Sequence, residues 1–271
     1  MKRILIITTL FLSTTSALKA QTIKIFYEVK AMGYIIYASS NELYPVSISL
    51  DMQLSNLTFS EGEKKVFVLP PKSEKFKIGE FSAIDRGHGY KFSYKYISTL
   101  GDVTITHYDN SFDYDLPFQK GKSYNVYQGY HGAFSHQDEN SLDFVMPEGT
   151  EVFAARGGIV VQVVQNNSES CSTEECKKYN NYITVMHSDG SFATYAHIKY
   201  HGSIYILGDS VKRGEAIAYS GNVGWSTGPH LHFVCFLGAF GKWNTLATKF
   251  RIDKGAESIF LKERNTYLRD Y

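Results

Sequence analysis

The 271-residue chain has little cysteine and no excess of charge of either sign. Its formal net charge is +1, and the lysines are scattered along the sequence. A protein that binds nucleic acid needs a basic face to meet the phosphate backbone, so we expect no nucleic-acid partner. After residue 20, no run of about 18 consecutive apolar residues occurs, so we expect no membrane anchor in the mature protein.

The first twenty residues are typical of a signal peptide. Lys2 and Arg3 precede the short apolar run Ile4–Leu12, and small residues follow up to Ala17 and Ala20. We expect cleavage after Ala20, with Ala17 as the other candidate. The sequence therefore predicts an exported protein, periplasmic or secreted. No cysteine lies near the cleavage region, which disfavours a lipid anchor there.

The three cysteines lie in different settings. Cys171 and Cys176 flank a short polar stretch and could close a local loop in an oxidising compartment, although the sequence leaves their pairing open. Cys235 lies in an apolar run and is expected to be a buried free thiol. A zinc site made of all three is disfavoured by their distance in sequence.

Amphipathic helical patterns are scarce, whereas β-branched and aromatic residues recur in short bursts between turn residues. This composition predicts an all-β fold. Apolar and polar residues alternate from Val46 to Leu54 and again from Tyr90 to Tyr96, as in strands with one buried face. We predict a small all-β, sandwich-like accessory domain over residues 21–115, and we find no cluster of reactive side chains in it.

A polar, acidic stretch over residues 109–115 separates this domain from a glycine-richer part of the chain. We predict an antiparallel β-sheet domain over residues 116–245 and a C-terminal β extension over residues 246–271. Within residues 182–197, two predicted strands flank Asp189-Gly190, and an Asp-Gly pair is a strong hairpin signal.

The histidines gather in this second domain. Six of them lie where the predicted strands could bring them together: His131, His136, His187, His197, His230 and His232. His230 and His232 are two residues apart beside the predicted strand Leu231–Leu237, so they would share a face about 6.6–6.8 Å apart. One imidazole could then bind a metal while the other meets a substrate. A single histidine in a β protein is more often a core or surface residue than a ligand, so this hypothesis depends on several groups together.

A catalytic zinc site takes three nitrogen or oxygen ligands and keeps one position open for water. His136 and Asp143 are the candidates that would join His232 as ligands. His197 would add a second imidazole, beside His230, that binds no metal.

These residues lie in motifs that resemble the lysostaphin/LytM-type zinc metallopeptidases, which cut peptide bonds in bacterial peptidoglycan. The motifs follow the family's order from Gln128 to Phe236: Ser135-His136, Leu142-Asp143-Phe144, the stretch 147–158, His187-Ser188-Asp189-Gly190, Thr194-Tyr195-Ala196-His197 and Ser226-Thr227-Gly228-Pro229-His230-Leu231-His232-Phe233. The resemblance implies His136, Asp143 and His232 as zinc ligands, and His197 and His230 as the catalytic pair. It also implies a peptidoglycan substrate, cleaved in its stem peptides or cross-bridges.

The chain departs from the family pattern at two places. Six residues separate His136 from Asp143, whereas the family commonly has three, so His131 is the substitute if the loop folds differently. Val234 follows the closing motif, where the family often has a glutamate that could support a ligand.

Two other functions remain as alternatives. Gly224 to Gly228 matches the Gly-x-Ser-x-Gly nucleophile elbow, with Ser226 as nucleophile, but an elbow needs a helix next and Pro229 follows with a predicted strand. The second alternative is a catalytically inactive relative that binds cell wall or activates another hydrolase. The complete set of candidate ligands argues against it. The sequence does not indicate which bond is cleaved or the oligomeric state.

Overall fold

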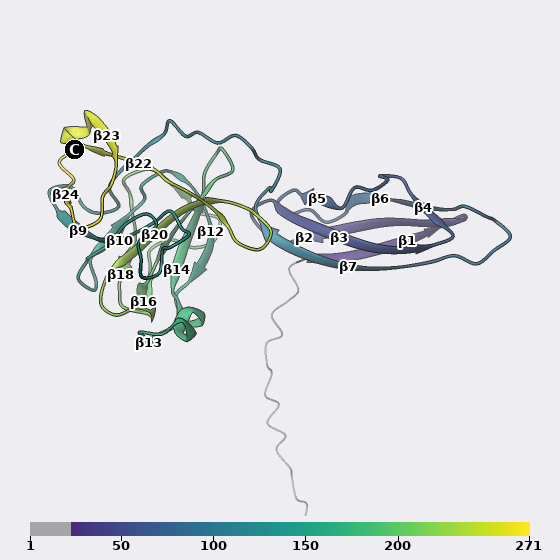
Figure 1. The fold of residues 1–271 in the computed structure, drawn as a ribbon, viewed down its shortest axis with the longest axis horizontal. Helices are drawn as coiled ribbons and strands as arrows, with labels where there is room; N and C mark the ends of the chain where they lie inside the picture. Colours follow the sequence, from purple (N-terminus) through teal and green to yellow (C-terminus); the bar gives the residue numbers. More distant parts are fainter. Residues whose placement is uncertain (1–22) are drawn as a thin grey trace, which may run out of the picture.

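The structure is a computed structural model that describes residues 23–271, so the predicted signal peptide lies outside the described residues. Figure 1 shows two lobes side by side, an elongated one formed by the N-terminal strands and a wider one formed by the rest of the chain. Both are built almost entirely of β-strands in mainly antiparallel sheets, which confirms the predicted all-β class. Among the described residues, no helix has the length and apolar character needed to cross a membrane.

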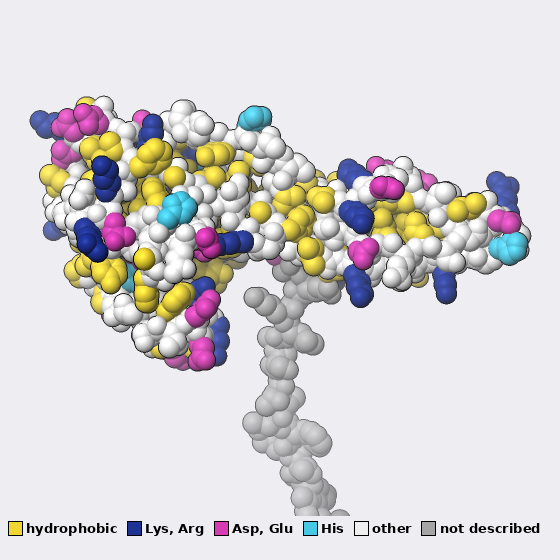
Figure 2. Space-filling view, viewed as in Figure 1, with side chains coloured by type: hydrophobic (Ala, Val, Ile, Leu, Met, Phe, Trp, Pro, Cys, Tyr) yellow, Lys and Arg dark blue, Asp and Glu magenta, His cyan; other side chains and the backbone are white. Residues whose placement is uncertain are grey.

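The elongated lobe consists of two antiparallel sheets around one apolar core, with strand orders β1-β2-β6-β4 and β5-β3-β7. Its strands are β1 (Ile23–Lys30), β2 (Gly33–Ser40), β3 (Val46–Ser55), β4 (Leu57–Phe59), β5 (Val66–Leu69), β6 (Phe76–Ala83) and β7 (Lys91–Leu100). The predicted alternation along β3 is confirmed, because Ile48 and Leu50 are fully buried whereas Asp51 and Gln53 are exposed. Basic and acidic side chains are interspersed over the face in Figure 2.

The wider lobe is built on a large sheet with strand order β17-β12-β14-β15-β20-β10-β9-β24, and β21 pairs with β20. Its strands are β9 (Ser123–Gln128), β10 (Ser141–Phe144), β12 (Gly158–Val164), β14 (Tyr182–Met186), β15 (Phe192–Ala196), β17 (Ser210–Val211), β20 (Leu231–Leu237), β21 (Asn244–Leu246) and β24 (Thr266–Leu268). The predicted hairpin joins β14 to β15. Gly190 turns it at a φ of 82°, a backbone conformation that glycine adopts without strain.

Shorter elements complete the wider lobe. A sheet of β11, β18 and β16 packs against the large sheet across a core that includes Val152, Val185 and Phe233. The bounds of these elements are β8 (Asp113–Tyr114), β11 (Glu151–Phe153), β13 (Ser170–Cys171), β16 (Ile198–Ser203), β18 (Ala216–Ser220), β19 (Gly224–Trp225), β22 (Lys249–Ile252), β23 (Glu257–Phe260) and the 3-10 helices η1 (Glu174–Tyr179) and η2 (Asp253–Gly255).

The C-terminal residues pack against the same lobe. Strand β24 pairs with β9, and β22 runs parallel to β8. The buried carboxylate of Asp115 accepts a 2.8 Å hydrogen bond from Arg251 Nε and lies 3.4 Å from Arg269 Nη2. Charge-assisted hydrogen bonds of this kind are among the stronger ones in proteins, so they hold the end of the chain against the sheet.

The two faces of the large sheet have different neighbours. In β20, Leu231 and Phe233 point into the core of the wider lobe. The alternate residues Val234 and Phe236 belong to the apolar core of the elongated lobe. Because side chains alternate along a strand, His232 lies on the face that the elongated lobe covers, about 13 Å along β20 from Phe236. The elongated lobe therefore covers the same side of the sheet as the candidate metal site, toward the other end of β20.

Candidate metal centre

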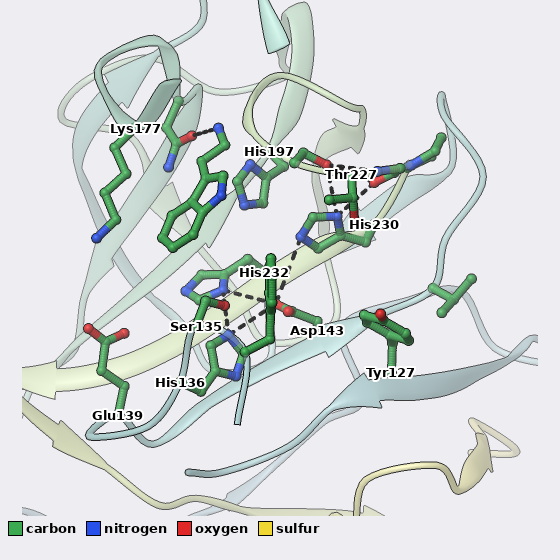
Figure 3. Close-up of a pocket in the computed structure, with 17 residues that line it drawn as sticks. Tyr127, Ser135, His136, Glu139, Asp143, Lys177, His197, Thr227, His230 and His232 are labelled. Carbon is green, nitrogen blue, oxygen red and sulfur yellow. Dashed lines mark hydrogen bonds and ion pairs between the residues drawn. The ribbon is translucent and has the colours of Figure 1, made fainter. Parts of the chain in front are cut away.

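The register of two neighbouring strands places the first pair of candidate ligands side by side. Asp143 in β10 is paired directly with His232 in β20. His136 comes from the loop between β9 and β10, and its side chain points at the other two (Figure 3). The three residues form a group of the size that can hold a metal ion. His131, the substitute ligand, is exposed and lies outside this group.

The distances between the facing atoms suit a zinc ion. His136 Nε2 lies 3.3 Å from His232 Nδ1 and 3.4 Å from Asp143 Oδ1, and His232 Nδ1 lies 2.9 Å from Asp143 Oδ1. Ligand atoms at about 2.0–2.2 Å from one tetrahedral zinc ion are about 3.3 Å apart. The donor set of two imidazoles and one carboxylate is also one that catalytic zinc sites use, so these residues fit the ion.

The candidate ligands His136 and Asp143 are buried, whereas His232 is half-buried. Burial disfavours the charged form of Asp143, but hydrogen bonds from His136 and His232 outweigh it and hold the pKa of Asp143 well below its usual range. Burial also disfavours a charged His136, yet the hydrogen bond to Asp143 raises the pKa of His136. Asp143 is therefore ionised at neutral pH, which is the form that binds a cation.

Groups behind the candidate ligands fix their orientation. His136 Nδ1 donates to the carbonyl oxygen of Gly129 at 3.1 Å, which directs Nε2 at Asp143 and His232. Gln128 Nε2 donates to Asp143 Oδ2 at 3.0 Å. This contact was not predicted from the sequence, which gave no signal for it beyond the position of Gln128 at the start of the motifs. Val234 is buried and apolar, so it gives Asp143 no hydrogen bond.

Two further imidazoles stand beside the candidate ligands (Figure 3). The rings of His197 and His230 have centroids 4.4 Å apart, and the centroid of His197 lies 5.9 Å from that of His232. His230 Nε2 is 3.9 Å from Asp143 Oδ1. His197 follows β15 in a left-handed conformation with a φ of 62°, which turns its side chain away from the regular alternation of the strand.

Hydrogen bonds determine which nitrogen of each ring carries the proton. His197 Nδ1 lies 2.8 Å from the carbonyl oxygen of Val223, and His230 Nδ1 lies 2.8 Å from that of Gly228. A carbonyl oxygen only accepts, so Nδ1 is the donor and Nε2 has a free lone pair in the neutral ring. Burial keeps both rings neutral, since it lowers the pKa of His197 to about 3 and also lowers the pKa of His230.

Ser226 does not have the surroundings of a nucleophile elbow. Its Oγ donates to the carbonyl oxygen of Gly228 at 2.8 Å and lies 3.2 Å from His230 Nδ1. Pro229 and strand β20 follow it, where an elbow has a helix. Because the hydroxyl proton and the His230 Nδ1 proton both point at Gly228, His230 cannot take a proton from Ser226 in this arrangement.

A cleft of about 410 Å³ contains these residues and has an aromatic wall. Phe134 and Trp225 face each other with ring centroids 6.0 Å apart. Trp225 is held from behind by Ser172, whose carbonyl oxygen accepts from Nε1 at 3.1 Å, and Lys177 lies over its ring. Ser172 lies inside the loop closed by a disulfide between Cys171 and Cys176.

The remaining sequence predictions on cysteine and histidine have mixed outcomes. Cys235 is a buried free thiol, as predicted. Of the six histidines expected to converge, four do, while His131 is exposed and His187 lies elsewhere. His187 is buried, and its Nδ1 lies 2.9 Å from the carbonyl oxygen of Gly157. His187 follows β14 at the hairpin turn, whereas His197 follows β15 at the opposite end of the same two strands. The order of the motifs in the sequence does not reveal this separation.

Comparison with known proteins identifies a domain of a peptidase family within the wider lobe. Residues 137–239 match the model of Peptidase family M23. The peptidoglycan DD-endopeptidase ShyA of Vibrio cholerae is 34% identical over 94 residues, which are 35% of this chain and 19% of that protein. Lysostaphin of Staphylococcus simulans is 32% identical over 126 residues, which are 45% of this chain and 22% of that protein. The match therefore spans about a fifth of the length of these curated relatives.

The catalytic domain of lysostaphin from Staphylococcus simulans is 29% identical, with 44% of this chain and 83% of that chain covered and a TM-score of 0.34. Together with the site, the family match defines a metallopeptidase-type domain. The chain carries a Peptidase M23 domain, and its resemblance to the lysostaphin/LytM-type peptidases is confirmed.

Proposed function

We propose that this protein is a zinc-dependent endopeptidase that hydrolyses peptide bonds in the stem peptides or cross-bridges of bacterial peptidoglycan. The observation that carries the proposal is the group formed by His136, Asp143 and His232, whose facing atoms are 2.9–3.4 Å apart. The family match begins one residue after His136, so the assignment of this ligand depends on the geometry.

His136, Asp143 and His232 would hold the zinc ion, and His197 and His230 would be the catalytic pair. A bound zinc ion supplies a water of lowered pKa and polarises the scissile carbonyl. The neutral rings of His197 and His230 offer free Nε2 atoms that can accept a proton and pass it to the leaving amine. Either ring, once protonated, can stabilise negative charge that develops on the carbonyl oxygen.

We further propose the arrangement of the whole chain. Residues 1–20 would direct export to the periplasm or beyond, residues 21–115 would form the accessory domain, residues 116–245 the peptidase domain, and residues 246–271 its extension. The disulfide between Cys171 and Cys176 supports an oxidising compartment. An apolar core formed mostly by residues of the elongated lobe supports an accessory domain.

The test uses purified peptidoglycan sacculi and the mature protein. We expect mass spectrometry to detect released fragments with new peptide termini, and we expect a zinc chelator to abolish their release. The new termini would identify the bond that is cleaved. Binding to sacculi without release, in a protein that is fully loaded with zinc, would instead support an inactive wall-binding relative.

A further inference from the structure

We propose that Gln128 is a positioning residue that joins the ligand Asp143 to the loop carrying the ligand His136. This inference rests on the proposed zinc site. Gln128 is the last residue of β9, is 4% exposed, and is paired with Asp143 in the register of β9 and β10. The pairing brings the amide within reach of the carboxylate on the same side of the sheet.

Both the NH₂ group and the oxygen of the Gln128 amide are hydrogen-bonded. Its Nε2 donates to Asp143 Oδ2 at 3.0 Å and to Ser135 Oγ at 2.8 Å. Its Oε1 accepts from the backbone nitrogens of Phe134 at 3.0 Å and Ser135 at 2.9 Å. Backbone nitrogens only donate, so the oxygen must face the loop and the NH₂ group must face Asp143. These four bonds fix the orientation of the amide.

The amide thereby acts on both ligands. With Oδ2 of Asp143 held by Gln128, the other oxygen, Oδ1, is directed at His136 and His232. On the loop side, Gln128 holds the residue directly before His136. Partners of this kind orient metal ligands and typically change metal affinity by about 10–100-fold when they are removed.

The same contacts explain how a loop with six residues between His136 and Asp143 still delivers the histidine. The loop folds back on itself, since the backbone nitrogen of His136 donates to the carbonyl oxygen of Gly132 at 3.2 Å. A Cβ atom at Gly132 would lie 2.4 Å from Cγ of Gln128. The glutamine side chain therefore occupies the space that the absence of a side chain at Gly132 leaves open.

The test compares zinc affinity in Gln128→Asn and Gln128→Met with that in the wild-type protein, measured by competition with a chromophoric chelator. The shorter amide of the Asn variant cannot reach Asp143 and the loop at once, and the Met variant keeps the length without the hydrogen bonds. We expect both to bind zinc at least tenfold more weakly. Gln137→Met is the matched control, because Gln137 is exposed on the same loop and bonds only to the carbonyl oxygen of Ala133 among the described residues.

A second readout separates positioning from general stability. In the cobalt-substituted Gln128→Asn protein, we expect a shifted visible absorption spectrum, because Asp143 would bind the ion in another orientation. Melting temperatures of the metal-free proteins show that the compared samples are folded. If the Met variant does not fold, the zinc affinity of the Asn variant alone tests the proposal. Unchanged zinc affinity and an unchanged cobalt spectrum in a folded Gln128→Asn variant would overturn the proposal. Failure of the wild-type protein to bind zinc would overturn the proposed function itself, and this inference with it.

Discussion

At the residue scale, His136, His197 and His230 each have Nδ1 held by a backbone carbonyl oxygen, which leaves Nε2 free for the cleft. This arrangement separates two kinds of role. His232 Nδ1 lies 2.9 Å from Asp143 and 3.3 Å from His136, the other candidate ligands, whereas the His197 ring packs against its neighbours and its Nδ1 is held by the carbonyl oxygen of Val223. Substitutions at these two positions should therefore have different effects.

We expect His232→Ala to abolish zinc binding and activity together, because two remaining ligands cannot complete a catalytic zinc site. We expect His197→Ala to keep close to one zinc ion per chain and to lose activity by about 100-fold or more, the range for removal of an acid–base group. Elemental analysis of metal content and a fragment-release assay on sacculi check both variants. Full zinc occupancy in the His232 variant would show that the ligand assignment is wrong.

Another residue-scale prediction concerns His187, which lies away from the candidate ligands. Burial lowers the pKa of His187 to about 4, below the value of about 6.5 for an unfolded chain. Between these two values the unfolded chain binds a proton that the folded protein does not. The metal-free protein should therefore lose stability as the pH falls from about 6.5 to 4, by up to about 1.4 kcal/mol per pH unit from this residue.

Urea unfolding of the metal-free protein at pH 7, 6 and 5 checks this prediction. His187→Gln keeps a donor for the carbonyl oxygen of Gly157 but does not titrate, so its stability should depend less steeply on pH. Other buried histidines contribute equally to both proteins, and the difference between the two slopes reports His187 alone. Parallel slopes for the two proteins would mean that His187 does not contribute.

At the element scale, the sequence predicts those strands and turns that are determined by residues close together in the chain. The predicted strand Leu231–Leu237 agrees with β20, and the alternation of β3 and the Asp189-Gly190 hairpin are confirmed, because each follows from side-chain alternation or turn chemistry. The pairing of Asp143 with His232 joins strands far apart in sequence, and no local pattern encodes that register. The contacts of Gln128 are closer in sequence, but they depend on how the loop between β9 and β10 folds back, and no local pattern encodes that path.

The loop closed by Cys171 and Cys176 gives the third prediction. We expect the double variant Cys171→Ser/Cys176→Ser to lose roughly 2 kcal/mol of stability, because the disulfide closes a short loop. Zinc content should not change, since the loop contains none of the candidate ligands. The Km for peptide substrate should rise, because Ser172 would hold Trp225 less firmly against the cleft.

Steady-state kinetics and tryptophan fluorescence measure these effects. Reduction of the wild-type protein with a phosphine should reproduce them, and the same treatment should leave the double variant unchanged. Equal Km values and identical fluorescence spectra for the two proteins would show that the disulfide does not position the wall of the cleft.

At the scale of the whole molecule, one sheet face serves two purposes. His232 and Asp143 occupy one end of it, and Phe192 and Phe236 at the other end are buried in the core of the elongated lobe. Tyr44 of that lobe packs edge-to-face on Phe192 at 6.3 Å. The lobes thus share apolar surface instead of meeting only through a linker, so we expect them to unfold as one cooperative unit.

Gly238 tests this coupling because it lies against the backbone of Leu100 and Gly101, at the end of β7. A Cβ atom there would lie 2.1 Å from the carbonyl oxygen of Leu100, and backbone cannot move aside as a flexible side chain can. We expect Gly238→Ala to destabilise the contact by about 1–3 kcal/mol, the usual range for overpacking. Gly89→Ala is the matched control, since a Cβ atom at Gly89 would meet nothing within 4 Å. Scanning calorimetry should give one transition for the wild-type and control proteins and two separated transitions for Gly238→Ala. Two transitions already in the wild-type protein would mean that the lobes are independent, and the elongated lobe could then not hold a fixed position relative to the cleft.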